Sequence, residues 1–422
     1  MNEQRFIIQG GKPLKGEIEV RGSKNAALPL LAASVLFADP VTLSNLPLIE
    51  DVFRMVEILE SMGARATWLE KRTLQVDARA IEPEKIDQAR VTSLRASLLF
   101  IGPLLARFKH CTIAHPGGDA IGARPLDTHF EAFKDLGITI ASHKTKQGMR
   151  YEFDASHLHG GEVILEEFSV TATENVLMLV SLLPEKTTVK LAATEPHVGE
   201  LINFLRKAGV SIANEGDHAL TIQGASTLKP LTHEVIPDYL EEGTFLILSA
   251  LMGGAVSVKN LSLAHLDAFR KKLTGMGITI EDNAARLRQK TLLPIKLQTL
   301  PHPGFPTDLQ APFGLLLTRA TGVSSIHEPL YEKRFGYLEE LKKMGADISI
   351  KNPHEATVTG PTPLTGASIR GFDLRAGMTL ILAGLIAKGE TVIENIYQVD
   401  RGYEAIDERL RALGADIRRV SA

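Results

Sequence analysis

The sequence is poor in the features that mark several classes of protein. It has one cysteine, Cys111, among 422 residues, which excludes a disulfide within the chain and a zinc site built from cysteines. Its formal net charge is -3, so no bulk attraction to nucleic acid or to an acidic membrane is expected. The longest apolar stretches, such as 98–106, are too short to cross a bilayer, and the N-terminal residues lack a signal-peptide pattern. We therefore expect a cytoplasmic protein that binds neither membrane nor nucleic acid.

Motifs for metals and for common nucleotide cofactors are also missing. The 13 histidines show no metal-ligand spacing such as HExxH, and neither a Walker loop nor a dinucleotide fingerprint is present. We expect no metal and no other cofactor. The composition, 44% hydrophobic and 23% charged, is that of an ordinary globular protein, and the length favours two or three domains.

What the sequence does have is an internal repeat. Six times, a short amphipathic helix is predicted to end at a glycine and to be followed by a strand, at intervals of 68 to 74 residues. A repeat of this length is a whole supersecondary unit. The six glycines are Gly63, Gly137, Gly209, Gly277, Gly345 and Gly414.

Each repeat follows one order of elements, which predicts an α/β fold. An apolar helix, expected to be buried, precedes a strand; the amphipathic helix and a closing strand follow. Six such units fit one closed ring or two groups of three, and we favour two domains because one core rarely exceeds about 250–300 residues. The predicted apolar helices span 26–36, 96–106, 176–183, 245–252, 309–318 and 376–387.

Polar residues recur at the starts of these apolar helices. Counting back 18 residues from equivalent strand positions reaches Asn25, Arg95, Thr173, Asp308 and Arg375, and in the remaining repeat Leu240, beside Glu241. Lys24, Arg95 and Arg375 oppose the helix dipole, which disfavours cations at an N-terminus. Each could reach water or pair with a carboxylate. Three such residues at equivalent positions instead favour a shared pocket for phosphate or carboxylate.

A glycine-rich loop follows the second predicted repeat strand. Residues 115–125 contain Gly117, Gly118 and Gly122 beside the ionisable Asp119 and Arg124. Most Pro-Gly-Gly segments are plain surface turns. The concentration of charged groups favours a lid instead.

Other polar residues have an ordinary and a functional interpretation. Asp308 at a helix start is typical of an N-cap, and it is also a candidate general base. Ser169 could cap a helix or donate to phosphate. Arg401 is predicted to start the last amphipathic helix, again against the dipole, and the stretch from Tyr331 to Arg334 is typical of a solvated face.

Six motifs together resemble the enolpyruvyl transferase family, and within it the enzymes that act on UDP-N-acetylglucosamine. The resemblance covers the whole chain, with the motifs in the family's order. They lie at 22–29, 94–97, 116–125, 305–308, 373–376 and 400–403.

This resemblance implies the architecture. It implies two inside-out α/β barrel domains of three repeats each, with the active site in the cleft between them. Domain I would comprise 1–22 and 233–422 and be completed by the N-terminal strand. Domain II would comprise 23–232 and carry the lid at 115–125.

The resemblance also implies the reaction. The enolpyruvyl group of phosphoenolpyruvate is transferred to the 3'-hydroxyl of UDP-N-acetylglucosamine, and phosphate is released. This is the first committed step of peptidoglycan synthesis, and so serves cell-wall biogenesis, cell shape and cell division. Two alternatives stay open: the sister enzymes that act on shikimate 3-phosphate, and a non-catalytic repeat protein that binds a sugar nucleotide.

The family's functional residues match positions of this chain one by one. Lys24, Arg124 and Arg401 would hold phosphoenolpyruvate, with Asn25 beside them, and Asp308 is the candidate base. Further cleft residues would be Leu330, Arg334 and Arg375. Contacts to the sugar nucleotide are implied for Arg95, Arg124, Pro125, Leu126, Asp127, Thr128, Ser169 and Val170.

The chain departs from the family at four positions. Most members carry cysteine where this chain has Asp119, which we expect to be the proton donor in its place. That replacement predicts insensitivity to fosfomycin, an epoxide that alkylates the thiol. Glu167, Tyr239 and Thr171 stand where many relatives have Lys, Arg and Gly. The loss of a lysine near the diphosphate puts the uridine-side contacts in doubt.

Overall fold

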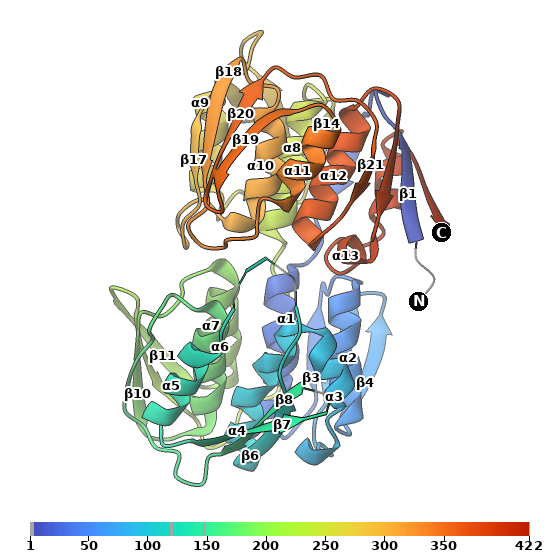
Figure 1. The fold of residues 1–422 in the computed structure, drawn as a ribbon. Helices are drawn as coiled ribbons and strands as arrows, with labels where there is room; N and C mark the ends of the chain where they lie inside the picture. Colours follow the sequence, from blue (N-terminus) through green and yellow to red (C-terminus); the bar gives the residue numbers. More distant parts are fainter. Residues whose placement is uncertain (1–3, 119–120, 123, 147, 422) are drawn as a thin grey trace. The chain divides into compact units, whose positions relative to one another are not determined.

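The computed structural model describes residues 4–118, 121–122, 124–146 and 148–421. The chain divides into two compact units, coloured along the sequence in Figure 1. Unit 1 is drawn from Met1–Arg21, Asp119–Ala123 and Pro237–Ala422, and unit 2 from Gly22–Gly118 and Arg124–Ile236. Each unit has its own apolar core.

Unit 2 contains three successive sets of elements. Each set has a buried helix, a strand, a second helix and a hairpin. Its buried helices are apolar almost all round, and nine of the ten residues in α1 are buried. The helices and strands, in order, are α1 (Lys24–Ala33), η1 (Ser34–Leu36), β3 (Val41–Ser44), α2 (Glu50–Ser61), β4 (Arg65–Glu70), β5 (Thr73–Asp77), η2 (Pro83–Lys85), α3 (Gln88–Ser93), η3 (Arg95–Phe100), α4 (Ile101–Phe108), β6 (His110–Ala114), α5 (Asp127–Asp135), β7 (Thr139–Thr145), β8 (Gly148–Asp154), β9 (Glu162–Ile164), α6 (Val170–Leu179), η4 (Val180–Leu182), β10 (Lys186–Lys190), α7 (Pro196–Ala208), β11 (Ser211–Gly216), β12 (Ala219–Gln223) and β13 (Thr232–Glu234).

The three sheets of unit 2 have orders β13-β3-β5-β4, β6-β8-β7 and β11-β12-β10-β9. In two of them a short strand joins in parallel: β13 beside β3, and β9 beside β10. Each hairpin is antiparallel, as in the pairing of β11 with β12. The pairing of β13 with β3 joins the last strand of unit 2 to its first.

Unit 1 repeats the same order of elements. Its α10 packs against both α8 and α12, three buried helices that lie together in Figure 1. The elements are β1 (Gln4–Gln9), β2 (Gly16–Glu19), α8 (Tyr239–Leu251), β14 (Val256–Lys259), α9 (Asp267–Met276), β15 (Ile278–Glu281), β16 (Ala284–Leu287), β17 (Lys296–Gln298), η5 (Thr307–Leu309), α10 (Gln310–Leu317), β18 (Gly322–His327), α11 (Gly336–Lys343), β19 (Asp347–Asn352), β20 (Glu355–Gly360), β21 (Ser368–Arg370), α12 (Leu374–Ile386), β22 (Glu390–Glu394), α13 (Tyr397–Asp400), α14 (Ile406–Ala412) and β23 (Asp416–Ser421).

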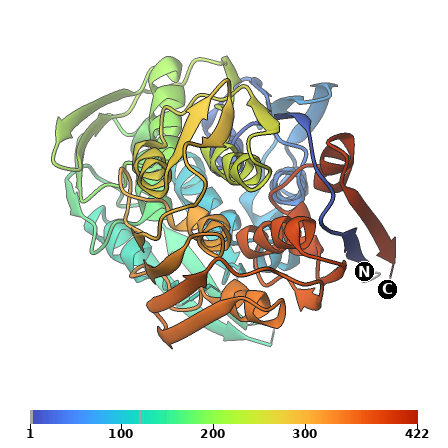
Figure 2. The same cartoon turned by 90° about the horizontal axis from the view of Figure 1, so that it is seen from above.

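The first strands of the chain belong to unit 1. β1 lies antiparallel between β22 and β23, with Phe6 opposite both Ile393 and Arg419, and β2 pairs in parallel with β14. Figure 2 shows β1 in blue beside β23 in dark red, near the two termini. The two ends of the chain therefore share one sheet.

The prediction that six helices end at a glycine is confirmed. All six glycines have a left-handed backbone, with φ between 83° and 110°. A residue with a Cβ rarely adopts this conformation, and glycine adopts it without steric cost. The regular spacing of these glycines is therefore a true structural repeat.

The predicted starts of three apolar helices are wrong. The helix predicted from 176 begins at Val170 and the one predicted from 245 begins at Tyr239, while 95–100 form a 3₁₀ turn before α4. A prediction based on apolar residues alone misses the first turn of a helix when that turn contains polar residues that are buried and hydrogen-bonded. Thr173, for example, is buried in the first turn of α6, and its Oγ1 accepts a hydrogen bond from the Ala193 amide at 3.0 Å.

The core of unit 1 includes three packed aromatic rings, and this gives a stability prediction. Phe313 lies 5.6 Å from Phe269 and 5.3 Å from Phe305, between ring centroids, and is fully buried. Phe313→Ala should lower the free energy of unfolding by about 3–5 kcal/mol, because it leaves a cavity. Urea denaturation measures this. Val323→Ala, at an exposed position, is the control, and an equal loss in both variants would contradict the prediction.

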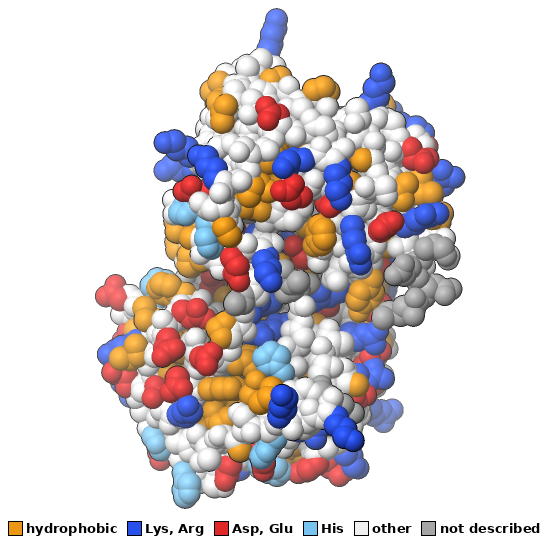
Figure 3. All heavy atoms as spheres, in the orientation of Figure 1, with side chains coloured by type: hydrophobic (Ala, Val, Ile, Leu, Met, Phe, Trp, Pro, Cys, Tyr) orange, Lys and Arg blue, Asp and Glu red, His pale blue; other side chains and the backbone are white. Residues whose placement is uncertain are grey.

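Within the described residues, no helix combines the length and the apolar character that crossing a membrane requires. On the face drawn in Figure 3, Lys and Arg side chains are interspersed with Asp and Glu.

Candidate active site

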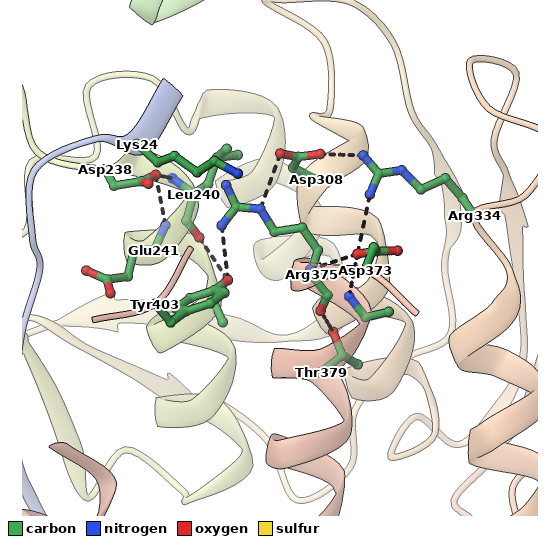
Figure 4. Close-up of polar contacts among 12 residues, drawn as sticks. Lys24, Asp238, Leu240, Glu241, Asp308, Arg334, Asp373, Arg375, Thr379 and Tyr403 are labelled. Atoms are coloured by element: carbon green, nitrogen blue, oxygen red, sulfur yellow. Dashed lines mark hydrogen bonds and ion pairs between the residues drawn. The ribbon is translucent and has the colours of Figure 1, made fainter. Parts of the chain in front are cut away.

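A carboxylate in unit 1 is held by two arginines. Asp308 lies in η5, and its Oδ1 accepts from Nη2 of Arg334 at 2.5 Å while its Oδ2 accepts from Nε of Arg375 at 3.2 Å. Figure 4 shows the carboxylate between the two guanidinium groups. Both arginines are almost fully buried. Burial by itself raises the pKa of Asp308, but the two guanidinium groups outweigh it and hold the pKa well below its usual range.

A second layer of polar groups holds Arg375. Asp373 caps α12, and its Oδ1 accepts from the backbone amides of Arg375 and Ala376. The Tyr403 hydroxyl lies 3.2 Å from Nη1 of Arg375 (Figure 4). It also lies 3.2 Å from Oγ1 of Thr244. The arginine is thus positioned by three different elements of unit 1.

Sequence reasoning had not assigned roles to Asp373, Tyr403 or Thr244. Asp373 carried a signal, because an Asp directly before an apolar helix is a typical N-cap. Tyr403 and Thr244 carried none, since their contact joins residues far apart in the sequence.

Arg401 does not start a helix, so the dipole argument for it is wrong. It follows the last residue of α13 as its C-cap, and α14 begins only at Ile406. A cation at this end of a helix is favoured rather than opposed by the dipole. The side chain is 7% exposed, and its Nη1 donates to Oε1 of Gln398 at 2.9 Å.

In unit 2, Lys24 is the first residue of α1 and pairs with a carboxylate. Its Nζ lies 2.6 Å from Oδ2 of Asp51, and both side chains are buried. Ser23 caps the helix, and Asn25 follows Lys24 in the first turn. Pairing with a carboxylate was the alternative interpretation of the cations at helix starts, and it holds for Lys24 and for Arg375.

Arg95 in unit 2 turns toward backbone oxygens. Its Nη2 donates to the carbonyl oxygen of Arg124 at 2.6 Å, and it lies 3.5 Å from that of Pro125. Leu126 is buried directly after them, and Asp127 and Thr128 form the first turn of α5. Five of the residues that the resemblance implies for binding the sugar nucleotide therefore form one continuous segment, 124–128. Arg95 holds this segment by its hydrogen bond to the Arg124 carbonyl.

The segment meets the start of α6 within unit 2. Ser169 caps α6 and Val170 is its first residue. Thr128 donates to Oε1 of Glu167 at 3.4 Å, and Nε2 of His129 lies 3.0 Å from Oγ1 of Thr171. Burial and the neighbouring Arg95 and Arg124 lower the pKa of His129 to about 3, so this histidine is neutral at pH 7.

Leu330 and Ile121, which belongs to the predicted lid, also lie in unit 1. Leu330 is 38% exposed, and its amide donates to Oε1 of Glu328 at 3.1 Å. In the predicted lid, the Ile121 carbonyl accepts from the Lys333 amide at 3.0 Å. Asp119, the predicted proton donor, lies outside the described residues.

The structure thus brings the predicted residues into local groups. Asp308, Arg334 and Arg375 touch one another in unit 1, and in unit 2 Arg95 holds the segment that starts at Arg124. Among the residues described, no three His, Cys, Asp or Glu side chains cluster as a metal site would need. A partly buried carboxylate held by two cations suits acid–base chemistry beside an anionic substrate.

Comparisons with known proteins define the class. A sequence model described as EPSP synthase (3-phosphoshikimate 1-carboxyvinyltransferase) matches residues 8–410. The fold matches the enolpyruvyl transferase NikO from Streptomyces tendae, with a TM-score of 0.89 and 25% identity over the whole of both chains. EPSP synthase from Acinetobacter baumannii shares the fold at a TM-score of 0.74 and 17% identity, over 99% of this chain and 100% of that one. The fold is the mixed α/β fold of the enolpyruvyl transferases.

Closer relatives narrow the class. Proteins called UDP-N-acetylglucosamine 1-carboxyvinyltransferase are 41% identical in Magnetococcus marinus, over 99% of both chains, and 40% identical in Helicobacter pylori strain P12, over 98% of both. A Caldanaerobacter subterraneus protein with this name and the number 1 is 42% identical, over 98% of this chain and 99% of its own. The chain therefore belongs to the UDP-N-acetylglucosamine 1-carboxyvinyltransferase family, which confirms the resemblance predicted from the six motifs.

Proposed function

We propose that the protein transfers enolpyruvyl from phosphoenolpyruvate to the 3'-hydroxyl of UDP-N-acetylglucosamine and releases phosphate. This would be the first committed step of peptidoglycan synthesis, carried out in the cytoplasm on small-molecule substrates. The observation that carries the proposal is the Asp308 carboxylate, kept ionised between Arg334 and Arg375. Identities of about 40% over nearly the whole chain support the choice of acceptor.

The chemistry assigns a role to each group. A proton from Asp119 goes to the methylene carbon of phosphoenolpyruvate, and the neighbouring carbon becomes oxocarbenium-like. The sugar hydroxyl attacks that carbon while its proton passes to Asp308, giving a tetrahedral ketal. The Asp119 carboxylate then takes back a proton from the new methyl group while phosphate departs, which restores the alkene. Lys24, Arg124 and Arg401 would stabilise the anionic donor, because fixed cations stabilise charge without reorganising.

Asp308 suits this role despite its weak basicity. A carboxylate with a lowered pKa is a poor base toward a free alcohol. The hydroxyl becomes strongly acidic only as its oxygen bonds to the cationic carbon, and at that moment a nearby ionised carboxylate takes the proton. Arg334 and Arg375 keep Asp308 in that form.

For the architecture, we propose that units 1 and 2 are the two domains of the family, each an inside-out barrel of three repeats. Side chains from both would act on one pair of substrates. The predicted boundaries, 1–22 with 233–422 and 23–232, remain part of this proposal.

The direct test is acceptor-dependent release of phosphate. Purified protein is incubated with phosphoenolpyruvate and either UDP-N-acetylglucosamine, shikimate 3-phosphate or no acceptor, and free phosphate is measured. We expect release with the sugar nucleotide alone. Release with shikimate 3-phosphate alone would establish the sister activity, to which the EPSP synthase match gives some support. Binding of the sugar nucleotide without release would establish the non-catalytic alternative.

Glu167 gives a prediction about the acceptor. If the diphosphate binds at the start of α6, beside Ser169, the exposed Glu167 carboxylate repels it. Glu167→Lys should lower the KM for UDP-N-acetylglucosamine about tenfold, which corresponds to about 1.4 kcal/mol, and leave the KM for phosphoenolpyruvate unchanged. Steady-state kinetics measures both. Glu166→Lys, the exposed neighbour, is the control, and an unchanged or higher acceptor KM in Glu167→Lys would refute the prediction.

A further inference from the structure

Arg419, on the last strand of unit 1, holds the carboxylate that directly precedes Arg401. Its Nη1 lies 2.7 Å from Oδ2 of Asp400, and its Nη2 lies 2.8 Å from Oδ1 of the same group. Nη2 also donates to Oδ1 of Asp407 at 3.2 Å. Two parallel bonds of this kind fix the orientation of a carboxylate as well as its position.

The arginine is itself held from the first strand of the chain. Its Cζ lies 4.8 Å from the centre of the Phe6 ring, and its Nη1 donates to Oε1 of Gln4 at 3.1 Å. Hydrogen bonds to Asp400, the largest effect, help raise the pKa of Arg419 above its usual range. The guanidinium is therefore a fixed cation between β1, β23 and α13.

The segment that carries Arg401 needs such support. α13 has only four residues, too few to be stable alone. On another side it lies very close to α12: a Cβ added at Gly377 would come within 2.7 Å of Val399, and one at Gly402 within 2.7 Å of Leu374. The segment is thus fixed by packing on α12 and by the ion pair with Arg419.

The charges around Arg401 give Arg419 a second effect. Asp400 is adjacent to Arg401 in the chain, and Asp407 is the second residue of the next helix. Arg419 neutralises both carboxylates, and Arg411 also pairs with Asp407 at 3.2 Å. Without Arg419, the largely buried Asp400 carboxylate would lose its bidentate partner, and an unpaired charge there would draw the segment toward water.

We propose that Arg419 is a positioning residue that fixes α13, and with it the backbone position from which Arg401 reaches an anionic substrate. This rests on the proposed function, in which Arg401 binds the phosphate or carboxylate of phosphoenolpyruvate.

The test compares Arg419→Met, which keeps most of the side-chain volume, with Arg418→Met at the exposed neighbouring position. Arg419→Met should raise the KM for phosphoenolpyruvate at least about tenfold, leave the KM for the acceptor unchanged and change kcat less. Arg418→Met should match the unmodified protein.

A second substitution separates charge from folding. In Arg419→Met, Asp400→Asn removes the carboxylate left without its partner, and it should recover most of the affinity for phosphoenolpyruvate. Thermal melting is followed in every variant. An unchanged KM for phosphoenolpyruvate in Arg419→Met would overturn the proposal, as would no recovery in the double variant or a parallel rise in both KM values.

Calorimetric titration of phosphoenolpyruvate is run on the same proteins, so that the inference does not depend on turnover. If the unmodified protein releases no phosphate, the proposed function fails. The inference is then still judged by the dissociation constant: weaker binding in Arg419→Met that Asp400→Asn restores supports it, and any other result overturns it.

Discussion

Asp308→Asn is expected to lower kcat by roughly 10²–10⁴-fold. Asparagine has nearly the shape of aspartate, but it cannot take the proton of the attacking hydroxyl. The KM for phosphoenolpyruvate should change little, because the cations proposed to bind it, Lys24, Arg124 and Arg401, are untouched. Steady-state kinetics with each substrate varied in turn measures the effect. A variant with more than about a tenth of the normal kcat would rule out Asp308 as the base.

The same substitution should also destabilise unit 1, and the pH dependence separates the two effects. Removing the carboxylate leaves two buried guanidinium groups without their shared partner, which should lower the free energy of unfolding by about 3 kcal/mol. This is the lower end of the usual range, because the Asp308 side chain is a quarter exposed. The lowered pKa of Asp308 means that its stabilisation is fully present above the unfolded pKa of about 4. It is lost as the pH falls toward the folded pKa. The difference in Tm between the two proteins should therefore shrink below about pH 4.

Arg334→Met provides the matched control. It removes one of the two cations that lower the pKa of Asp308, so that pKa should rise. The acid limb of the kcat profile should then move to higher pH, while activity near neutral pH is retained in part. An unmoved profile would show that Asp308 does not determine the acid limb.

Much of this organisation could be predicted from local sequence, and the reason is physical. A glycine that ends a helix with a left-handed backbone leaves a signal within a few residues, and all six signals were correct. Polar residues at helix starts were found in the same way. The apolar patterns failed where the first turn of a helix buries polar residues with partners, as at Thr173.

The contacts that set the chemistry could not be predicted, because the fold joins distant residues. Nothing near Lys24 indicates that it pairs with Asp51, and nothing near Arg401 indicates that α13 ends there. Phe6 meets Arg419 only because the first and last strands share a sheet. Local sequence marks which residues are unusual; the topology decides which of them meet.

The second large effect concerns Asp119, whose role is a prediction from sequence and family resemblance. The protein should keep its full activity after incubation with fosfomycin, because a carboxylate cannot form the thioether that inactivates the cysteine-bearing members of the family. Asp119→Cys should be inactivated and should gain the mass of one fosfomycin molecule. Asp119→Asn should lose roughly 10²-fold or more in kcat, since an amide cannot supply the proton.

Cys111 does not interfere with this test. It is the one cysteine of the chain, it is 2% exposed, and burial raises the pKa of its thiol far above its usual range. A protonated, inaccessible thiol is not a nucleophile, so intact-mass spectrometry of the unmodified protein should show no adduct. An adduct on the unmodified protein would contradict the prediction. So would an Asp119→Cys variant that stays active and insensitive to the drug, because a thiol at the donor position would then lie outside the reach of a ligand bound where phosphoenolpyruvate binds.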